Sequence, residues 1–104
     1  MPLLRVCDVG DVPELGVHRF EVDGRTVAIV NLGPDGFRAV DAVCSHEHAW
    51  LDEGDVDPDA NTIECPKHGS MFDLDTGRPR ALPAIRPVQV YEVTVKDDDI
   101  MIEV

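Results

Sequence analysis

The sequence has few of the residues that nucleic-acid and membrane partners require. Only 9 of its 104 residues are Lys or Arg, against 21 Asp or Glu, and the formal net charge is −12. Such a surface repels phosphate backbones and anionic headgroups, so we expect neither nucleic acid nor membranes as partners. No run of residues approaches the roughly 20 apolar positions of a transmembrane helix, and the N-terminus lacks the long apolar stretch of a secretory signal. The sequence therefore predicts a cytoplasmic protein.

Cysteine is also scarce, and its number is odd. The three thiols, Cys7, Cys44 and Cys65, cannot all pair within the chain, and a reducing cytoplasm keeps thiols free or bound to metal. A chain of this length provides one hydrophobic core. We therefore expect a monomer with a single domain, residues 1–104, and one site of chemistry.

Long helical periods are absent as well. The best candidate, residues 9–15, contains Gly10 and Pro13 and is at most one turn. Apolar and polar residues instead alternate with period two in five runs, residues 17–22, 26–32, 37–43, 88–95 and 100–104. Turn signals separate these runs, at residues 23–24, 33–36 and 96–99. The pattern predicts an all-β fold with antiparallel connections.

The middle of the chain, from Cys44 to Pro83, loses this alternation and gathers Gly, Pro, Cys and His. Two motifs stand out there, C-S-H at residues 44–46 and C-P-K-H-G-S at residues 65–70. Each pairs one thiolate with one imidazole, on a stretch where an extended loop or a tight turn can point both side chains the same way. Two such loops facing each other could hold a binuclear iron–sulfur cluster, since thiolates and imidazoles both ligate its iron.

A mononuclear zinc site is the nearest alternative, because two Cys and two His are also a common zinc set. Zinc fingers, however, usually draw a Cys pair from one element and a His pair from another. Here each motif contributes one of each, and a single residue separates Cys44 from His46. We therefore favour the iron–sulfur cluster.

The two motifs, continued by M-F-D at residues 71–73 and T-G at residues 76–77, resemble the Rieske family. The resemblance extends over the whole chain and includes Pro83-Ala84, which matches the family's proline-containing loop that shelters the cluster. It implies one [2Fe–2S] cluster whose ligands are Cys44 and Cys65 on the inner iron and His46 and His68 on the outer iron. His48 is an alternative ligand, but only Cys44 to His46 has the family spacing.

The resemblance also implies a fold and a role. The fold is an antiparallel β-sandwich with a small cluster-binding subdomain at about residues 43–84. The chain is most similar to ferredoxin components of ring-hydroxylating dioxygenases, which are electron carriers and not enzymes. We thus expect transient docking to an NAD(P)H-dependent flavin reductase and to a terminal non-haem iron oxygenase. An accessory role in iron–sulfur cluster assembly or another redox pathway is the alternative.

Departures from high-potential members of the family bear on the reduction potential. Ala49 and Lys67 occupy the positions where those proteins carry a cysteine pair, so the disulfide between the loops cannot form. Phe72 stands where those proteins place a tyrosine hydroxyl near a cysteine sulfur, although the serine is present as Ser70. With fewer hydrogen bonds and a strongly acidic chain, the potential should lie towards the negative end of the roughly −150 to +300 mV Rieske range.

The remaining chemistry-bearing residues have structural interpretations. Cys7 is expected to be a small buried hydrophobe, and His18 a surface or edge residue. Trp50 more often packs than contacts a partner. The acidic run from Asp52 to Asp59 is either a solvated loop or a surface that faces a basic partner.

Overall fold

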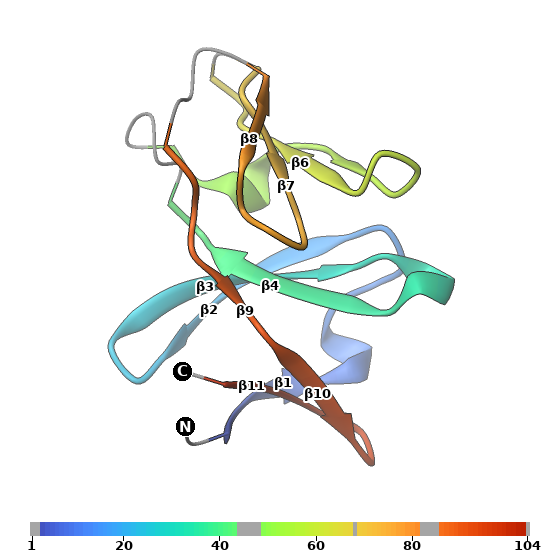
Figure 1. The fold of residues 1–104 in the computed structure, drawn as a ribbon. Helices are drawn as coiled ribbons and strands as arrows, with labels where there is room; N and C mark the ends of the chain where they lie inside the picture. Colours follow the sequence, from blue (N-terminus) through green and yellow to red (C-terminus); the bar gives the residue numbers. More distant parts are fainter. Residues whose placement is uncertain (1–2, 44–48, 68, 82–85, 104) are drawn as a thin grey trace.

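Three antiparallel sheets are stacked in the computed structural model, which describes residues 3–43, 49–67, 69–81 and 86–103 (Figure 1). The terminal sheet has the order β1 (Leu3–Asp8), β11 (Asp99–Glu103), β10 (Val93–Lys96). The central sheet has the order β2 (Val17–Val22), β3 (Arg25–Asn31), β4 (Phe37–Asp41), β9 (Val90–Tyr91). The small sheet has the order β5 (Val56–Asp57), β6 (Thr62–Glu64), β7 (Met71–Asp73), β8 (Pro79–Ala81).

Helical structure in the described residues is limited to three single turns of 3₁₀ helix, η1 (Val9–Asp11), η2 (Gly33–Asp35) and η3 (Leu51–Glu53). The first of these lies within the segment 9–15 that the sequence allowed at most one turn. None of the helices in the described part of the chain is long and apolar enough to cross a membrane. The predicted all-β class, a sandwich of antiparallel sheets, is thus confirmed.

The central sheet is buried on both faces, and this gives the molecule two cores, so the expectation of one hydrophobic core is wrong. Along β3, the side chains of Val27 and Ile29 join the core shared with the terminal sheet, while Ala28 and Val30 join the core beneath the small sheet. Successive side chains of a strand point to opposite faces, so one apolar run can supply both cores. All four residues have no exposed surface.

Hairpin turns fall where the sequence placed them. β2 and β3 are joined by Asp23 and Gly24, whose φ angles are +51° and +78°. Two positive φ angles are what a tight hairpin turn requires, and a glycine adopts one of them without strain. Asp97 in the β10–β11 turn likewise has a φ of +56°. These two turns set the register of their strand pairs.

The predicted strand over residues 88–95 is wrong in one respect, because the structure divides it in two. β9 pairs with β4 of the central sheet, whereas β10 pairs with β11 of the terminal sheet. The chain changes sheets at Glu92, whose carbonyl accepts a hydrogen bond from the amide of Glu103 at 3.0 Å. The sequence does carry a signal of this break, since the apolar positions change from even numbers, Val88 and Val90, to odd numbers from Tyr91 onwards.

The small sheet and η3 are held against the central sheet and the segment before β9 by a close backbone approach and by ion pairs. Gly77, in the β7–β8 turn, accepts a 2.8 Å hydrogen bond from the amide of Val88, and a Cβ on Gly77 would lie 2.0 Å from the Val88 carbonyl oxygen. The ion pairs are Arg19–Asp52 at 3.6 Å and Arg38–Asp75 at 2.8 Å. The small sheet is therefore held in a defined position over β4 and β9 (Figure 1).

Candidate metal centre

Cys65 begins the connection between β6 and β7, which carries the second of the two sequence motifs. Its amide donates to the Ser70 carbonyl at 2.6 Å, and its own carbonyl accepts from the Gly69 amide at 3.2 Å. The strands on either side are in register, with Glu64 opposite Met71. Gly69 has a φ of +75°, in the region that favours glycine. The motif thus forms a closed turn whose two ends are fixed by the sheet.

The first motif lies between two residues that pair with each other. Val43 and Trp50 form an isolated antiparallel bridge, and the Leu51 amide donates to the Ala42 carbonyl at 2.7 Å. Residues 44–48 lie outside the described residues. They contain Cys44 and His46 of the predicted ligand set and the alternative ligand His48. Both motifs are therefore mounted on paired backbone.

The described surroundings of Cys65 fit an iron–sulfur ligand. Cys65 is 1% exposed and belongs to the core beneath the small sheet, together with Leu51, Ile63 and Phe72. It is in no disulfide. A thiolate in rigid apolar surroundings suits a cluster, whose potential depends on burial and on hydrogen bonds to the sulfurs.

The ligand set itself stays a prediction. Of its four members, only Cys65 is among the described residues, and Cys44, His46 and His68 are not. The described residues alone contain no group of three or more His, Cys, Asp or Glu arranged to hold a metal ion. The Pro83-Ala84 segment also lies outside the described part of the chain.

The residues on which the potential argument depends are described. Ser70 is 1% exposed, and Phe72 is completely buried beneath the turn that starts at Cys65. Ala49 is buried and Lys67 is exposed. Ser70 and Phe72 thus lie inside the candidate centre, while Lys67 lies on its surface.

Cys7 and His18 have the surroundings that the sequence predicted. Cys7, on β1, is 4% exposed in the core between the terminal and central sheets, a different core from that of Cys65. Burial, followed by the charge of Asp11, raises the pKa of the Cys7 thiol to about 11. His18 is exposed on β2, at the edge of the central sheet. Neither residue belongs to the candidate centre.

Asp73, the last residue of the M-F-D run, fixes the β7–β8 turn. Its carboxylate accepts hydrogen bonds from the amides of Asp75 at 2.8 Å and Thr76 at 3.0 Å, and from the Arg80 guanidinium at 3.1 Å. Burial tends to raise the pKa of Asp73, but these hydrogen bonds outweigh it and the pKa is lowered. The acidic residue of the motif therefore shapes the turn that carries Gly77.

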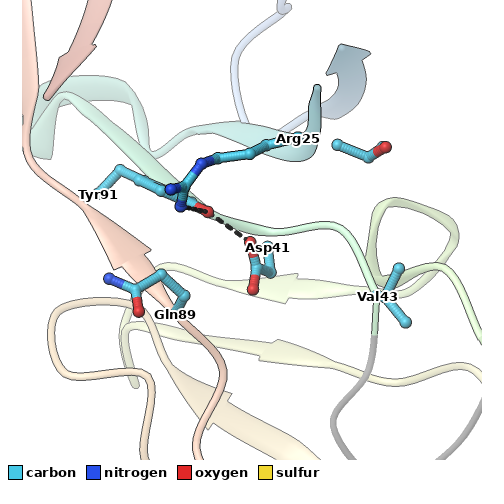
Figure 2. A pocket seen from close by; sticks show the side chains of 6 residues that line it. Arg25, Asp41, Val43, Gln89 and Tyr91 are labelled. Carbon is cyan, nitrogen blue, oxygen red and sulfur yellow. Dashed lines mark hydrogen bonds between the residues drawn. The ribbon is translucent and has the colours of Figure 1, made fainter. Parts of the chain in front are cut away.

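A surface hollow of about 370 Å³ lies beside Val43 and contains a polar group that the sequence did not reveal (Figure 2). The Tyr91 hydroxyl donates to Asp41 Oδ1 at 2.6 Å, and the Arg25 guanidinium donates to the same hydroxyl at 3.5 Å. Burial, then the bond to Asp41, raises the pKa of Tyr91, which Arg25 partly opposes. The three residues come from β9, β4 and β3, so no spacing along the chain could have indicated their contact.

Together these features define a class: a stack of antiparallel sheets with one Cys-and-His motif after β4 of the central sheet, between the bridged residues Val43 and Trp50, and a second between β6 and β7 of the small sheet. The model of the Rieske [2Fe-2S] domain matches residues 3–92, and the chain belongs to that family.

Close relatives match along almost their whole length. The chain is 39% identical over 103 residues to the 3-phenylpropionate/cinnamic acid dioxygenase ferredoxin subunit of Escherichia coli strain K12, covering 99% of this chain and 94% of the relative. Among solved structures, the ferredoxin of carbazole 1,9a-dioxygenase from Nocardioides aromaticivorans IC177 matches with a TM-score of 0.91 at 35% identity, covering 98% and 97% of the two chains.

A third match is a ferredoxin solved in a complex. It comes from the structure of the reduced oxygenase and oxidised ferredoxin of carbazole 1,9a-dioxygenase, with a TM-score of 0.85 and 35% identity over 96% of this chain and 91% of that one. Family and relatives agree on the cofactor, a Rieske-type [2Fe–2S] cluster, and on the role. The chain is an electron-carrying ferredoxin component and not a catalytic subunit.

Proposed function

We propose that this chain carries single electrons from an NAD(P)H-dependent flavin reductase to a terminal non-haem iron oxygenase. The observation that carries the proposal is the match to dioxygenase ferredoxin subunits along almost the full length of both chains. The solved complex of a similar ferredoxin with its oxygenase supports direct docking to the acceptor. The chain is proposed to act as a monomer in the cytoplasm, where the free thiol of Cys7 is compatible with a reducing environment.

The cluster is proposed to be bound by Cys44 and Cys65 on one iron and by His46 and His68 on the other. When bound, it would supply one-electron redox chemistry. The protein's own contribution is to fix the ligands: the Cys65 turn is closed by two backbone hydrogen bonds, and the segment with Cys44 starts and ends at the Val43–Trp50 bridge. The buried core beneath Cys65 excludes water from that side.

Substitution of the thiols tests the ligand set. Cys65→Ser and Cys44→Ser should abolish the brown colour and remove the two irons and two acid-labile sulfides per chain. Cys7→Ser is the matched control, because Cys7 is buried like Cys65 but lies in the other core. It should keep the low average g value of a Rieske centre after reduction. Loss of the cluster in Cys7→Ser, or its retention in Cys65→Ser, would show that the thiols are wrongly assigned.

Reconstitution tests the role. Reductase, this chain and oxygenase, mixed with NAD(P)H and an aromatic substrate, should form hydroxylated product, and leaving out any one protein should stop the reaction. If oxygenase and reductase genes lie beside the gene for this chain, their products are the first partners to examine. Complete turnover without this chain would refute the proposed role. Neighbouring cluster-assembly genes, with electron transfer only to assembly proteins, would also refute it.

A further inference from the structure

Val43 and Trp50 form an exposed apolar pair at the two ends of the segment that contains Cys44 and His46. Their exposed fractions are 41% and 38%, although the two residues are joined by a backbone bridge. The other exposed large hydrophobic residues of the described chain, Leu3, Leu15 and Val95, lie on the terminal sheet or before β2. Among the described residues, Val43 and Trp50 are therefore the one case in which two exposed large hydrophobic residues are neighbours. They also lie beside the proposed ligands.

The Trp50 ring is held in place from one side. The guanidinium carbon of Arg19 lies 3.9 Å from the ring centroid, and Arg19 Nε lies 3.6 Å from Asp52 Oδ2. Arg19 comes from the edge strand β2, so the contact joins the central sheet to the start of η3. A side chain that is already ordered loses less conformational entropy when a partner covers it. Tryptophan and arginine are also the residue types most enriched at binding hot spots.

The charges beside this pair indicate the chemistry of its partner. In the segment after Trp50, the exposed charged side chains are all acidic: Glu53, Asp55, Asp57 and Asp59. The nearest described cation, Arg19, is already paired with Asp52, whose side chain is only 12% exposed. The complementary surface is therefore an apolar recess with lysine or arginine at its rim.

The surface next to Val43 is hollowed. Val43 also lines the hollow formed with Arg25, Asp41, Gln89 and Tyr91 (Figure 2). A partner that covers the Val43–Trp50 pair thus meets the exposed part of the Trp50 side chain and the hollow beside Val43. Fully desolvated anchors beside recesses are typical of the centre of an interface.

We propose that Val43 and Trp50, held by Arg19, form the apolar anchor on which the terminal oxygenase docks. The inference rests on the proposed function and adds the residues that provide affinity for the acceptor. It assigns Trp50 a role in partner contact where the sequence favoured packing. The acidic residues after Trp50 steer the approach, and the apolar pair holds the complex long enough for one electron to pass.

The test begins with the wild-type chain, which must first reduce its oxygenase; failure at this step refutes the proposed function and not the anchor. Trp50→Ala is then compared with Val95→Ala, a matched removal of an exposed hydrophobic residue from β10 on the terminal sheet. Iron content and the spectrum of the reduced cluster confirm that each variant is loaded. We expect the oxygenase KM for the ferredoxin to rise about tenfold in Trp50→Ala and to stay within twofold in Val95→Ala.

A measurement on the unmutated chain keeps the test independent of folding. Trp50 is the only tryptophan, so incorporation of 5-fluorotryptophan gives a single ¹⁹F resonance. Excess oxygenase should change the chemical shift of this resonance; broadening alone does not count, because any complex with a large protein tumbles more slowly. An unchanged chemical shift, a fully loaded Trp50→Ala variant with wild-type KM, or an effect of Trp50→Ala on reduction by the reductase alone would each overturn the proposal.

Discussion

The Tyr91 hydroxyl on β9 donates a 2.6 Å hydrogen bond to the Asp41 carboxylate on β4, three residues before Cys44. β9 pairs with β4 through only two residue pairs, Ala39–Tyr91 and Val40–Val90. The side-chain bond therefore reinforces a short strand pairing at the point where β4 leads into the first motif.

Tyr91→Phe should reduce the free energy of unfolding by about 1 to 3 kcal/mol, since Tyr91 is buried and a hydrogen bond to a charged acceptor is lost. Urea unfolding followed by circular dichroism measures the loss. Asp41→Asn is the companion variant, because an amide oxygen still accepts from the hydroxyl and less stability should be lost. A Tyr91→Phe variant within 0.5 kcal/mol of wild type would mean that the bond contributes nothing net.

Alkaline pH should destabilise the protein through Cys7. Burial raises the pKa of this thiol from 9.0 to about 11, so the folded state keeps a proton that the unfolded state releases. The stabilisation is complete below pH 9 and is lost as the pH rises towards 11. Unfolding curves from pH 8 to 11 should show this decrease, and Cys7→Ala should remove most of it. Tyr91, whose pKa is also raised, adds a smaller decrease above pH 10. A wild-type stability that is flat from pH 9 to 11 would contradict the expected titration of Cys7.

The close approach of Gly77 to Val88 can be tested against a matched glycine. Gly77 and Gly24 have nearly equal φ angles, +76° and +78°, but a Cβ would meet the Val88 carbonyl oxygen only at Gly77. Gly24→Ala should cost about 1 kcal/mol from backbone strain alone. Gly77→Ala should cost about 1 to 3 kcal/mol more, because the β7–β8 turn must move away from the central sheet. If Gly77→Ala and Gly24→Ala lose the same stability in thermal unfolding, the close approach of Gly77 to the Val88 carbonyl does not limit the residue at position 77.

Electron transfer from the reductase should slow as salt rises, since the chain carries a net charge of −12. Between about 0.05 and 0.5 M salt the screening length decreases by roughly a factor of three. Stopped-flow reduction measures the rate, and a rate indifferent to salt would exclude electrostatic steering.

The structure also shows which acidic residues to change. Asp52 is the partner of Arg19, and the Asp57 carboxylate accepts from the amides of Asp59 and Ala60, so both have structural contacts. Glu53, Asp55 and Asp59 are exposed, and their replacement by Lys should flatten the salt dependence. If the salt dependence of the rate is unchanged in these variants, the segment from Asp52 to Asp59 does not steer the partner and is only a solvated loop.

The long strands and their turns could be predicted because their signals are local. Alternation over residues 17–22 and the Asp23-Gly24 turn each specify their own geometry. The small sheet could not be predicted strand by strand, since β5 to β8 have only two or three residues each and carry no measurable period. β1 was also not predicted as a strand, although Cys7 within it was expected to be buried.

The candidate centre was predicted from ligand types and spacing, which depend on the metal and not on the surrounding fold. Contacts between distant segments were beyond this reasoning. The stacking of Arg19 on Trp50 and the bond from Tyr91 to Asp41 join residues 31 and 50 positions apart, and a single sequence carries no signal for either.

The closed turn at Cys65 has a consequence for the speed of electron transfer. Its backbone is fixed by two hydrogen bonds, and its side chain lies against Leu51, Ile63 and Phe72 in a core without exposed surface at those positions. Close-packed interiors are nearly incompressible, so the thiolate position should change little when the charge of the centre changes by one. A small nuclear displacement between the two oxidation states means a low reorganisation energy, and the carrier can then exchange electrons rapidly with partners of similar potential.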